Sequence, residues 1–145
     1  MTIKENFLRI MCTHTEMALA TSTYSQPNIR VVNFYYDEEE RKIFFTSFEN
    51  KDKIREFEIN PKVAFTTIPP QRAGREHVKA KGVVRKSSKS IYAVKSQFAQ
   101  KVADYGAIID EVGEHLVLFE IVFDTATVTL SFEDISVLEM KKWDA

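Results

Sequence analysis

Two lysines stand at the start of a predicted helix, directly after a strand that ends in two hydroxyl-bearing residues. The strand ends at Thr46 and Ser47, and Lys51 and Lys53 follow in the first helical turn. A helix N-terminus carries partial positive charge and free backbone N–H groups, so it favours acidic side chains. A phosphate held between the lysines and these N–H groups would remove the conflict. The spacing therefore indicates a phosphate site, although a helix capped by Asn50 with both lysines in water explains the same pattern.

Two polar residues interrupt an otherwise apolar strand that is predicted over residues 28–37. Arg30 and Asn33 flank Val31 and Val32 in this strand. Polar groups at such positions usually have hydrogen-bonding partners. One interpretation is that they contact a ligand. The other is that Arg30 pairs with a carboxylate of the chain and Asn33 faces solvent.

The length and charge of the chain limit the classes of partner. The 145 residues fit a single domain spanning residues 1–145. The 20 basic and 21 acidic residues give a formal net charge of −1. This balance gives no reason to expect a polyanionic partner, so nucleic-acid binding is not expected. No run approaches the roughly 18 apolar residues of a membrane span, so neither membrane insertion nor secretion is expected.

The cysteine and histidine residues also exclude classes of site. Cys12 is the only cysteine. An intramolecular disulfide is therefore impossible, and the chain suits a reducing compartment, so we expect a cytoplasmic protein. His14, His77 and His115 are too far apart in sequence to show metal-ligand spacing. No metal site is expected.

These candidate residues must be positioned by a mainly β fold. Apolar periodicity predicts helices over residues 3–11, 51–59 and 87–105. Period-two patterns and turn residues predict seven strands, of which the first three form an antiparallel meander. These strands cover residues 17–23, 28–37, 41–48, 62–68, 77–86, 116–123 and 127–132. Because closure removes exposed strand edges, we expect an antiparallel, closed or split β-barrel with added helices, with a β-sandwich as the alternative.

Several of these segments resemble one known family. The order and spacing of residues 18–23, 26–32, 43–47, Lys53 and 60–65 are similar to those of the pyridoxamine 5'-phosphate oxidase family of FMN-binding split barrels. Each motif alone is weak, but together they are specific, and the match is best over the N-terminal part of the chain. The resemblance implies a split barrel with FMN as its cofactor.

The resemblance also implies roles for individual residues. The strand that contains Arg30 contacts the flavin ring and ribityl chain in that family, which implies Arg30, Val31, Val32 and Asn33. The strand end and helix start hold the phosphate, which implies Thr46, Ser47 and Lys53. The family commonly places an arginine just before that lysine, whereas this chain has Asp52 there. Lys51 could take the arginine's place, although as a point charge and not as a bidentate donor.

Two further expectations follow from the same family. It often has a glutamine at the start of the fifth strand, where this chain has His77, so a neutral His77 is a candidate hydrogen-bond partner of the flavin. Members are homodimers with the flavin at the subunit interface, so a second chain is expected to complete the pocket. The small-molecule substrate is unknown.

The resemblance leaves two functions open. Pyridoxamine 5'-phosphate oxidases hold the substrate phosphate with a C-terminal tryptophan and arginine pattern, and residues 131–145 contain no arginine. We therefore expect an FMN-dependent oxidoreductase that acts on a different substrate. The alternative is a non-catalytic module that binds or senses a flavin, a deazaflavin or haem.

Overall fold

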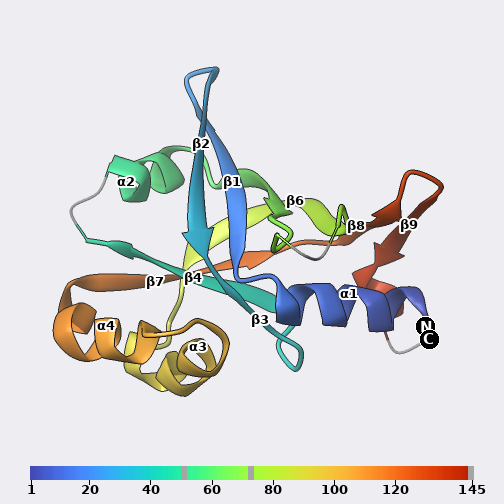
Figure 1. The fold of residues 1–145 in the computed structure, drawn as a ribbon. Helices are drawn as coiled ribbons and strands as arrows, with labels where there is room; N and C mark the ends of the chain where they lie inside the picture. The colour runs from blue at the N-terminus through green and yellow to red at the C-terminus, as the bar shows by residue number, and fades with distance from the viewer. Residues whose placement is uncertain (50–51, 72–73, 144–145) are drawn as a thin grey trace.

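The computed structural model describes residues 1–49, 52–71 and 74–143, except for the side chain of Lys53. Within these residues, one antiparallel sheet of nine strands of different lengths curls into a split barrel, with helices packed around it (Figure 1). The strands are β1 Glu16–Thr23, β2 Gln26–Asn33, β3 Tyr35–Asp37, β4 Lys42–Phe48, β5 Lys62–Thr67, β6 His77–Lys86, β7 Leu116–Val122, β8 Thr125–Ser131 and β9 Asp134–Glu139. The α-helices are α1 Ile3–Thr13, α2 Asp52–Ile59, α3 Lys95–Lys101 and α4 Tyr105–Val112, and short 3₁₀ helices cover Ile91–Val94, Gly113–His115 and Met140–Lys142. The predicted antiparallel split barrel with added helices is confirmed.

The split lies between β2 and β4. Neighbouring strands follow the order β2-β1-β5-β6-β7-β4-β3, so β2 and β3 stand at opposite ends of the ladder although only Phe34 separates them in the chain. Among the described residues, no ladder joins β2 to β4. The chain therefore turns from one edge of the barrel to the other at Phe34 and leaves a slot between these two strands.

The predicted single strand over residues 28–37 and the predicted meander are wrong at this point. Phe34 and Tyr35 are 0% and 5% exposed. Successive side chains of a straight strand point to opposite faces. A chain that buries two large neighbours must therefore bend or be covered on both faces, and here both occur. β2 pairs with β1, β3 pairs with β4, and Tyr35 enters a separate core.

Two clusters of buried aromatic side chains hold the barrel together. The rings of Phe45 and Phe119 stack inside it with centroids 5.5 Å apart, and Phe57 from α2 meets both rings edge-on. Outside the barrel, Phe44 belongs to a second cluster and packs against side chains of α3 and α4. These two helices therefore cover the outer side of β4, below it in Figure 1.

The predicted helix over residues 87–105 is divided in the structure. A 3₁₀ turn and α3 replace its central part, α4 begins only at its last residue, and the break between α3 and α4 contains Asp104 with φ +65°. The left-handed conformation is tolerated by aspartate better than by most residues. The break turns α4 back so that its first residue, Tyr105, is buried with Phe98.

The C-terminal segment, for which no helix or strand is predicted from the sequence, forms β9 and a 3₁₀ helix. β8 begins at Thr125, two residues before the strand predicted over residues 127–132. Trp143 is 5% exposed and meets Phe7 of α1 edge-on at 5.9 Å. The C-terminal segment up to Trp143 therefore lies against the N-terminal helix α1 (Figure 1). None of the described helices is long and apolar enough to span a membrane.

Candidate functional site

A cavity of about 280 Å³ occupies the slot between β2 and β4, and we call it the barrel-split cavity. The predicted residues Val31, Val32, Asn33, Thr46 and Ser47 all line it. The other lining residues come from the end of β4, from α4 and from the start of β7, and they are Phe48, Tyr105, Ile108 and Leu116. The fold thus brings together two sequence segments that were selected separately, because the barrel is open where they face each other.

The polar groups of the cavity are concentrated on β4. The hydroxyls of Thr46 and Tyr105 share a hydrogen bond of 2.5 Å, and the buried Ser47 donates a longer bond of 3.4 Å to the carbonyl of Phe48. Burial raises the pKa of Tyr105, and its hydrogen bond with Thr46 partly offsets that effect. The phenol is therefore neutral at physiological pH. The cavity combines an apolar wall with hydroxyls, which suits a ligand with both kinds of surface.

Arg30 does not line the barrel-split cavity. Its Nη2 atom lies 2.5 Å from Oε2 of Glu56 on α2, and Glu56 also accepts hydrogen bonds from Thr21 and Asn28. Burial acts to raise the pKa of Glu56, but the hydrogen bonds from Asn28 and Thr21 and the charge of Arg30 outweigh it, so the pKa is lowered. Arg30 therefore anchors α2 to β2 within one chain.

The predicted phosphate lysines are only partly placed. Lys51 lies outside the described residues, and the structure describes the backbone of Lys53 in the first turn of α2 but not its side chain. Thr46 and Ser47 lie near the end of β4, a few residues before this turn. The chain therefore leads from the cavity to the N-terminus of α2.

His77 lies apart from the cavity within one chain. It begins β6, opposite Thr129 of β8, and its Nδ1 atom donates to the carbonyl of Arg75 at 2.8 Å. His77 is not among the residues that line the cavity. It can reach such a site only from a second chain.

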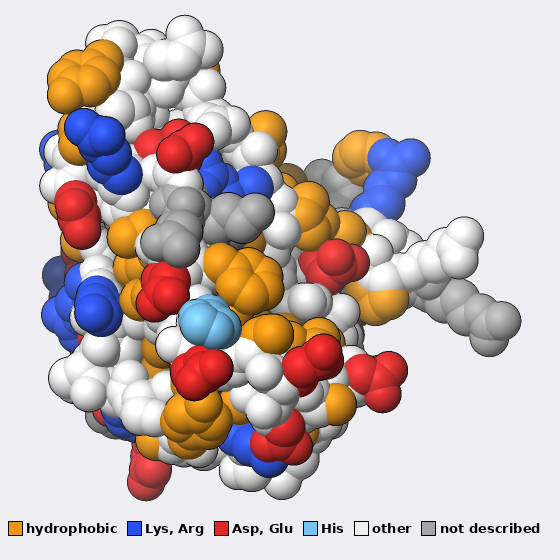
Figure 2. All heavy atoms as spheres, turned by 90° about the vertical axis from the view of Figure 1, so that its left-hand side faces the viewer, with side chains coloured by type: hydrophobic (Ala, Val, Ile, Leu, Met, Phe, Trp, Pro, Cys, Tyr) orange, Lys and Arg blue, Asp and Glu red, His pale blue; other side chains and the backbone are white. Residues whose placement is uncertain are grey.

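A histidine that the sequence analysis did not select, His115, directly precedes Leu116 of the cavity lining. Nδ1 of His115 is 3.2 Å from Oε1 of Glu49, and the backbone N–H of Glu49 donates to the His115 carbonyl at 2.9 Å. These bonds tie the end of β4 to the start of β7. Figure 2 faces this side of the molecule and shows hydrophobic side chains beside carboxylates and a histidine.

The functional residues that sequence reasoning missed belong to α4. Tyr105 and Ile108 reach the cavity only because the chain reverses at Asp104. Their helical spacing was visible in the sequence, but nothing in it indicated which strand they would face. A tyrosine three residues before an isoleucine is typical of any buried helix.

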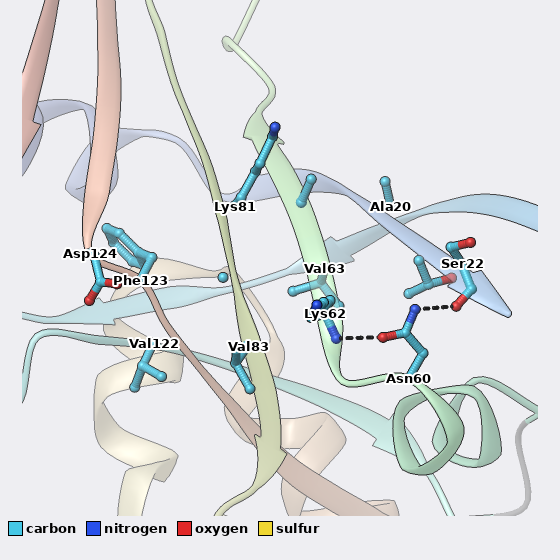
Figure 3. A pocket seen from close by; sticks show the side chains of 13 residues that line it. Ala20, Ser22, Asn60, Lys62, Val63, Lys81, Val83, Val122, Phe123 and Asp124 are labelled. Carbon is cyan, nitrogen blue, oxygen red and sulfur yellow. Dashed lines mark hydrogen bonds between the residues drawn. The ribbon is translucent and has the colours of Figure 1, made fainter. Parts of the chain in front are cut away.

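A second hollow lies on the outer face of the sheet. This groove of about 590 Å³ crosses β1, β5, β6 and the end of β7 (Figure 3). Asn60 closes one end of it by donating to the Ser22 carbonyl at 2.8 Å and accepting from the Lys62 backbone N–H at 3.1 Å. Its floor is formed by small and β-branched residues that include Ala20, Ala64, Val83 and Val122. Its polar lining residues lie around this apolar floor, so it resembles a packing surface more than a reaction site.

Comparisons with solved structures agree with this fold at low sequence identity. A candidate pyridoxamine 5'-phosphate oxidase from Listeria innocua has a TM-score of 0.71 and 16% identity, covering 90% of this chain and 100% of that chain. A haem-binding protein from Mycobacterium smegmatis has a TM-score of 0.79 and 11% identity, covering 99% of this chain and 60% of that chain. An FAD-binding protein from Mesorhizobium loti has a TM-score of 0.63 and 17% identity, covering 87% and 92% of the two chains. None of the curated proteins matches the sequence.

The sequence itself matches a family model described as pyridoxamine 5'-phosphate oxidase-like over residues 10–134. This match spans β1 to β8 and both walls of the barrel-split cavity. It also extends beyond the N-terminal segments that carried the resemblance. The chain therefore belongs to the pyridoxamine 5'-phosphate oxidase-like family.

Proposed function

We propose that the chain binds FMN in the barrel-split cavity and acts as an FMN-dependent oxidoreductase. The observation that carries the proposal is that β2 and β4 bring Val31, Val32 and Asn33 to the same cavity as Thr46 and Ser47. The apolar wall from β2 suits a flavin ring, and the hydroxyls of β4 suit a phosphorylated polar chain. Membership of the family supports the choice of a flavin.

In this proposal, each part of the chain has a distinct task. Thr46 donates a hydrogen bond to the phosphate, Ser47 lines the cavity beside it, and Lys53, with Lys51, supplies positive charge at the N-terminus of α2. Asn33 and the edge of β2 hold the ring, while Arg30 fixes α2 through Glu56. When bound, FMN supplies hydride or electron transfer, and the protein supplies orientation and electrostatics.

The size of the cavity supports a site shared between two chains. Its volume of about 280 Å³ lies just below the range of roughly 300 to 1,000 Å³ that is usual for ligand pockets. A second copy of the chain that covered the slot would enlarge and enclose the pocket. We therefore propose a homodimer with the flavin at the subunit interface, and His77 as a contribution from the second chain.

The outer face of the sheet supplies a surface for this dimer. Cross-strand pairs place Ile29, Ala20 and Ala64 in one row across β2, β1 and β5. Ile29 is 68% exposed and Val31 57% exposed. Contiguous apolar patches of this kind mark interaction sites. Val31 belongs both to this face and to the cavity lining, so a chain that packed here would also wall the cavity.

The first test is a titration of the purified protein with FMN, followed by absorbance and flavin fluorescence. We expect saturation near one FMN per chain, and loss of binding in Lys53→Ala with unchanged circular dichroism. Lys86→Ala, an exposed lysine on β6, is the matched control. Absence of binding at micromolar FMN, or equal affinity in Lys53→Ala and wild type, would contradict the proposal.

The dimer is tested separately by sedimentation. Val31→Asp should convert the dimer to a monomer and weaken FMN binding, because a charge on the apolar face must be desolvated on association. Ala93→Asp, an exposed position in the 3₁₀ helix Ile91–Val94 and away from this face, makes the same change of charge and is the control. A wild-type chain that sediments as a monomer while it binds FMN fully would overturn the shared pocket.

A second function is a non-catalytic module that holds a flavin, a deazaflavin or haem. It is favoured by the likeness of the fold to the haem-binding protein from Mycobacterium smegmatis. Haem titration separates the two, because a Soret band with no flavin binding would support the second function. Turnover of bound flavin with a panel of electron donors and acceptors would support the first. The single cysteine supports a cytoplasmic location for either function.

A further inference from the structure

We propose that the Tyr105 hydroxyl orients the Thr46 hydroxyl toward the phosphate of bound FMN, so that α4 sets the preference for phosphorylated over unphosphorylated flavin. This inference rests on the proposed function, since it assigns a positioning residue to the same site. Tyr105 and Thr46 are 59 residues apart in sequence, and both line the barrel-split cavity. Their hydroxyls are 2.5 Å apart.

The direction of this hydrogen bond follows from the acidity of the two groups. Each hydroxyl has one proton, so a bond between them uses one proton and leaves the other for a third group. A phenol is a far stronger acid than an aliphatic alcohol and is the better donor. Either hydroxyl could be the donor in this geometry. In the proposed arrangement Tyr105 donates to Thr46, which leaves the Thr46 proton for an acceptor in the cavity. Hydrogen bonds in such a chain polarise one another, which favours an anionic acceptor.

The position of Tyr105 is fixed by packing on the side away from the cavity. Its ring stacks on Phe98 of α3 with centroids 4.8 Å apart, and Phe98 meets Tyr35 of β3 edge-on at 4.9 Å. Gly106 allows α4 to approach α3, because a Cβ at this position would lie 3.3 Å from Cβ of Ala99. The phenol is thus held between two elements, and its hydroxyl cannot follow a ligand. It can only direct Thr46.

Ser47 is less suited to the same task. The residue is 4% exposed, and its hydroxyl donates to the carbonyl of Phe48 at 3.4 Å. Thr46 is the half-buried hydroxyl of the pair and the one with a partner on α4. We therefore assign to Thr46 the hydroxyl that donates to the phosphate and that Tyr105 of α4 positions.

The test compares the affinities for FMN and riboflavin, which differ only by the phosphate. Tyr105→Phe should weaken FMN binding by about 3- to 10-fold, because it weakens the hydrogen bond from Thr46 to the charged phosphate. It should leave riboflavin binding within about twofold, because the contacts with the flavin ring do not change. Thr46→Val should weaken FMN binding by about 10-fold or more. Because Tyr105 acts through Thr46, the double variant should be no weaker than Thr46→Val alone.

Tyr35→Phe is the matched control for these variants. Tyr35 belongs to the same aromatic cluster, and its hydroxyl has no hydrogen-bond partner among the described residues. We expect its removal to leave both affinities unchanged. Equal losses for FMN and riboflavin in Tyr105→Phe, or additive losses in the double variant, would overturn the inference while FMN binding stands. A wild-type chain that binds neither flavin would overturn the proposed function and this inference with it.

Discussion

The Nζ atom of Lys101 lies 3.6 Å from the centroid of the Phe34 ring and donates a hydrogen bond of 2.7 Å to the carbonyl of Met11. One side chain thus connects α3, the C-terminal turn of α1 and the residue at which β2 gives way to β3. The last turn of α1 has no basic residue of its own. The hydrogen bond of Lys101 and its contact with Phe34 therefore join the elements that meet at the corner on which the barrel splits.

This position predicts a specific dependence of stability on pH. Burial lowers the pKa of Lys101 to about 7, and only the nearby Cys12 opposes that effect. The unfolded chain has a lysine pKa of about 10.4, so between these values it binds more protons than the folded chain. The free energy of unfolding should therefore rise with pH over this window as far as Lys101 is concerned.

Lys101→Met should remove this rise. The free energies of unfolding of wild type and Lys101→Met are measured with urea at pH 7 and pH 9.5. The difference between the two proteins at each pH isolates the contribution of Lys101, because the contributions of the other titrating groups cancel. Wild type should gain stability relative to Lys101→Met at the higher pH. Lys86 is exposed, and Lys86→Met serves as the control. Its free energy of unfolding should change with pH in the same way as that of wild type. Parallel curves for Lys101→Met would show that Lys101 is not desolvated as the packing implies.

β6 passes close to the backbone of β7 at Gly82. A Cβ atom there would lie 2.5 Å from the Val122 carbonyl oxygen and 3.0 Å from Cγ2 of Ile121. The first of these atoms belongs to a paired strand and cannot move without disturbing the ladder. Gly82→Ala should therefore lower the free energy of unfolding by about 1 to 3 kcal/mol, the usual cost of overpacking. Chemical unfolding that shows no loss would contradict the close approach of β6 and β7.

Trp143 makes the C-terminal segment part of the core. It packs on Phe7, and Nζ of Lys4 lies 4.4 Å from its ring centroid. Trp143→Ala should lower the free energy of unfolding by about 3 to 5 kcal/mol, and Trp143→Phe by much less. Because this is the only tryptophan, its fluorescence also reports on the segment directly. Emission typical of a solvent-exposed indole in the native wild type would contradict the packing.

Much of the fold was predictable from the sequence because local signals and burial agree there. Period-two alternation places β1, β4, β5 and β6 close to their predicted bounds, and β6 matches them exactly in its first and last residues. The split at Phe34 was not predictable in the same way. Continuous β propensity on both sides of Phe34 hides a corner that only the packing of the whole barrel decides. The same holds for β9, whose Ile135 and Val137 are 57% and 60% exposed and give no clear buried face.

The candidate site was predictable only in part, and for a related reason. Val31 to Asn33 and Thr46 with Ser47 were selected through the resemblance, and the structure places them in one cavity. Tyr105 was not selected, because its role depends on the reversal at Asp104 and not on any motif. Arg30 shows that a sequence motif does not identify the partner of a residue. Its ion pair with Glu56 matches the structural alternative that the sequence left open, and a linear pattern contains no information on which carboxylate lies nearby.

The contact between Arg30 and Glu56 gives the last prediction. Their side chains are 17% and 21% exposed, so the pair is only partly solvated, and Thr21 and Asn28 add hydrogen bonds to the same carboxylate. The pKa of Glu56 is lowered in the folded chain: burial opposes the shift, but the hydrogen bonds from Asn28 and Thr21 and the charge of Arg30 prevail. A carboxyl with a lowered pKa stabilises the fold above its unfolded pKa of about 4.3, and that contribution is lost as pH falls through the folded value.

Glu56→Gln should therefore destabilise the chain at pH 7 by about 1.5 to 3 kcal/mol, the range for hydrogen bonds to charged groups. The deficit relative to wild type should shrink steadily as the pH is lowered below about 4. Glu58→Gln, an exposed carboxyl on the same helix, should show neither effect. Because Glu56 holds α2, whose first turn contains Lys53, the proposed function further requires weaker FMN binding in Glu56→Gln than in Glu58→Gln. A deficit that is constant from pH 7 to pH 3 would mean that the carboxylate charge does not hold α2 against β2, and that Arg30 is free to serve another partner.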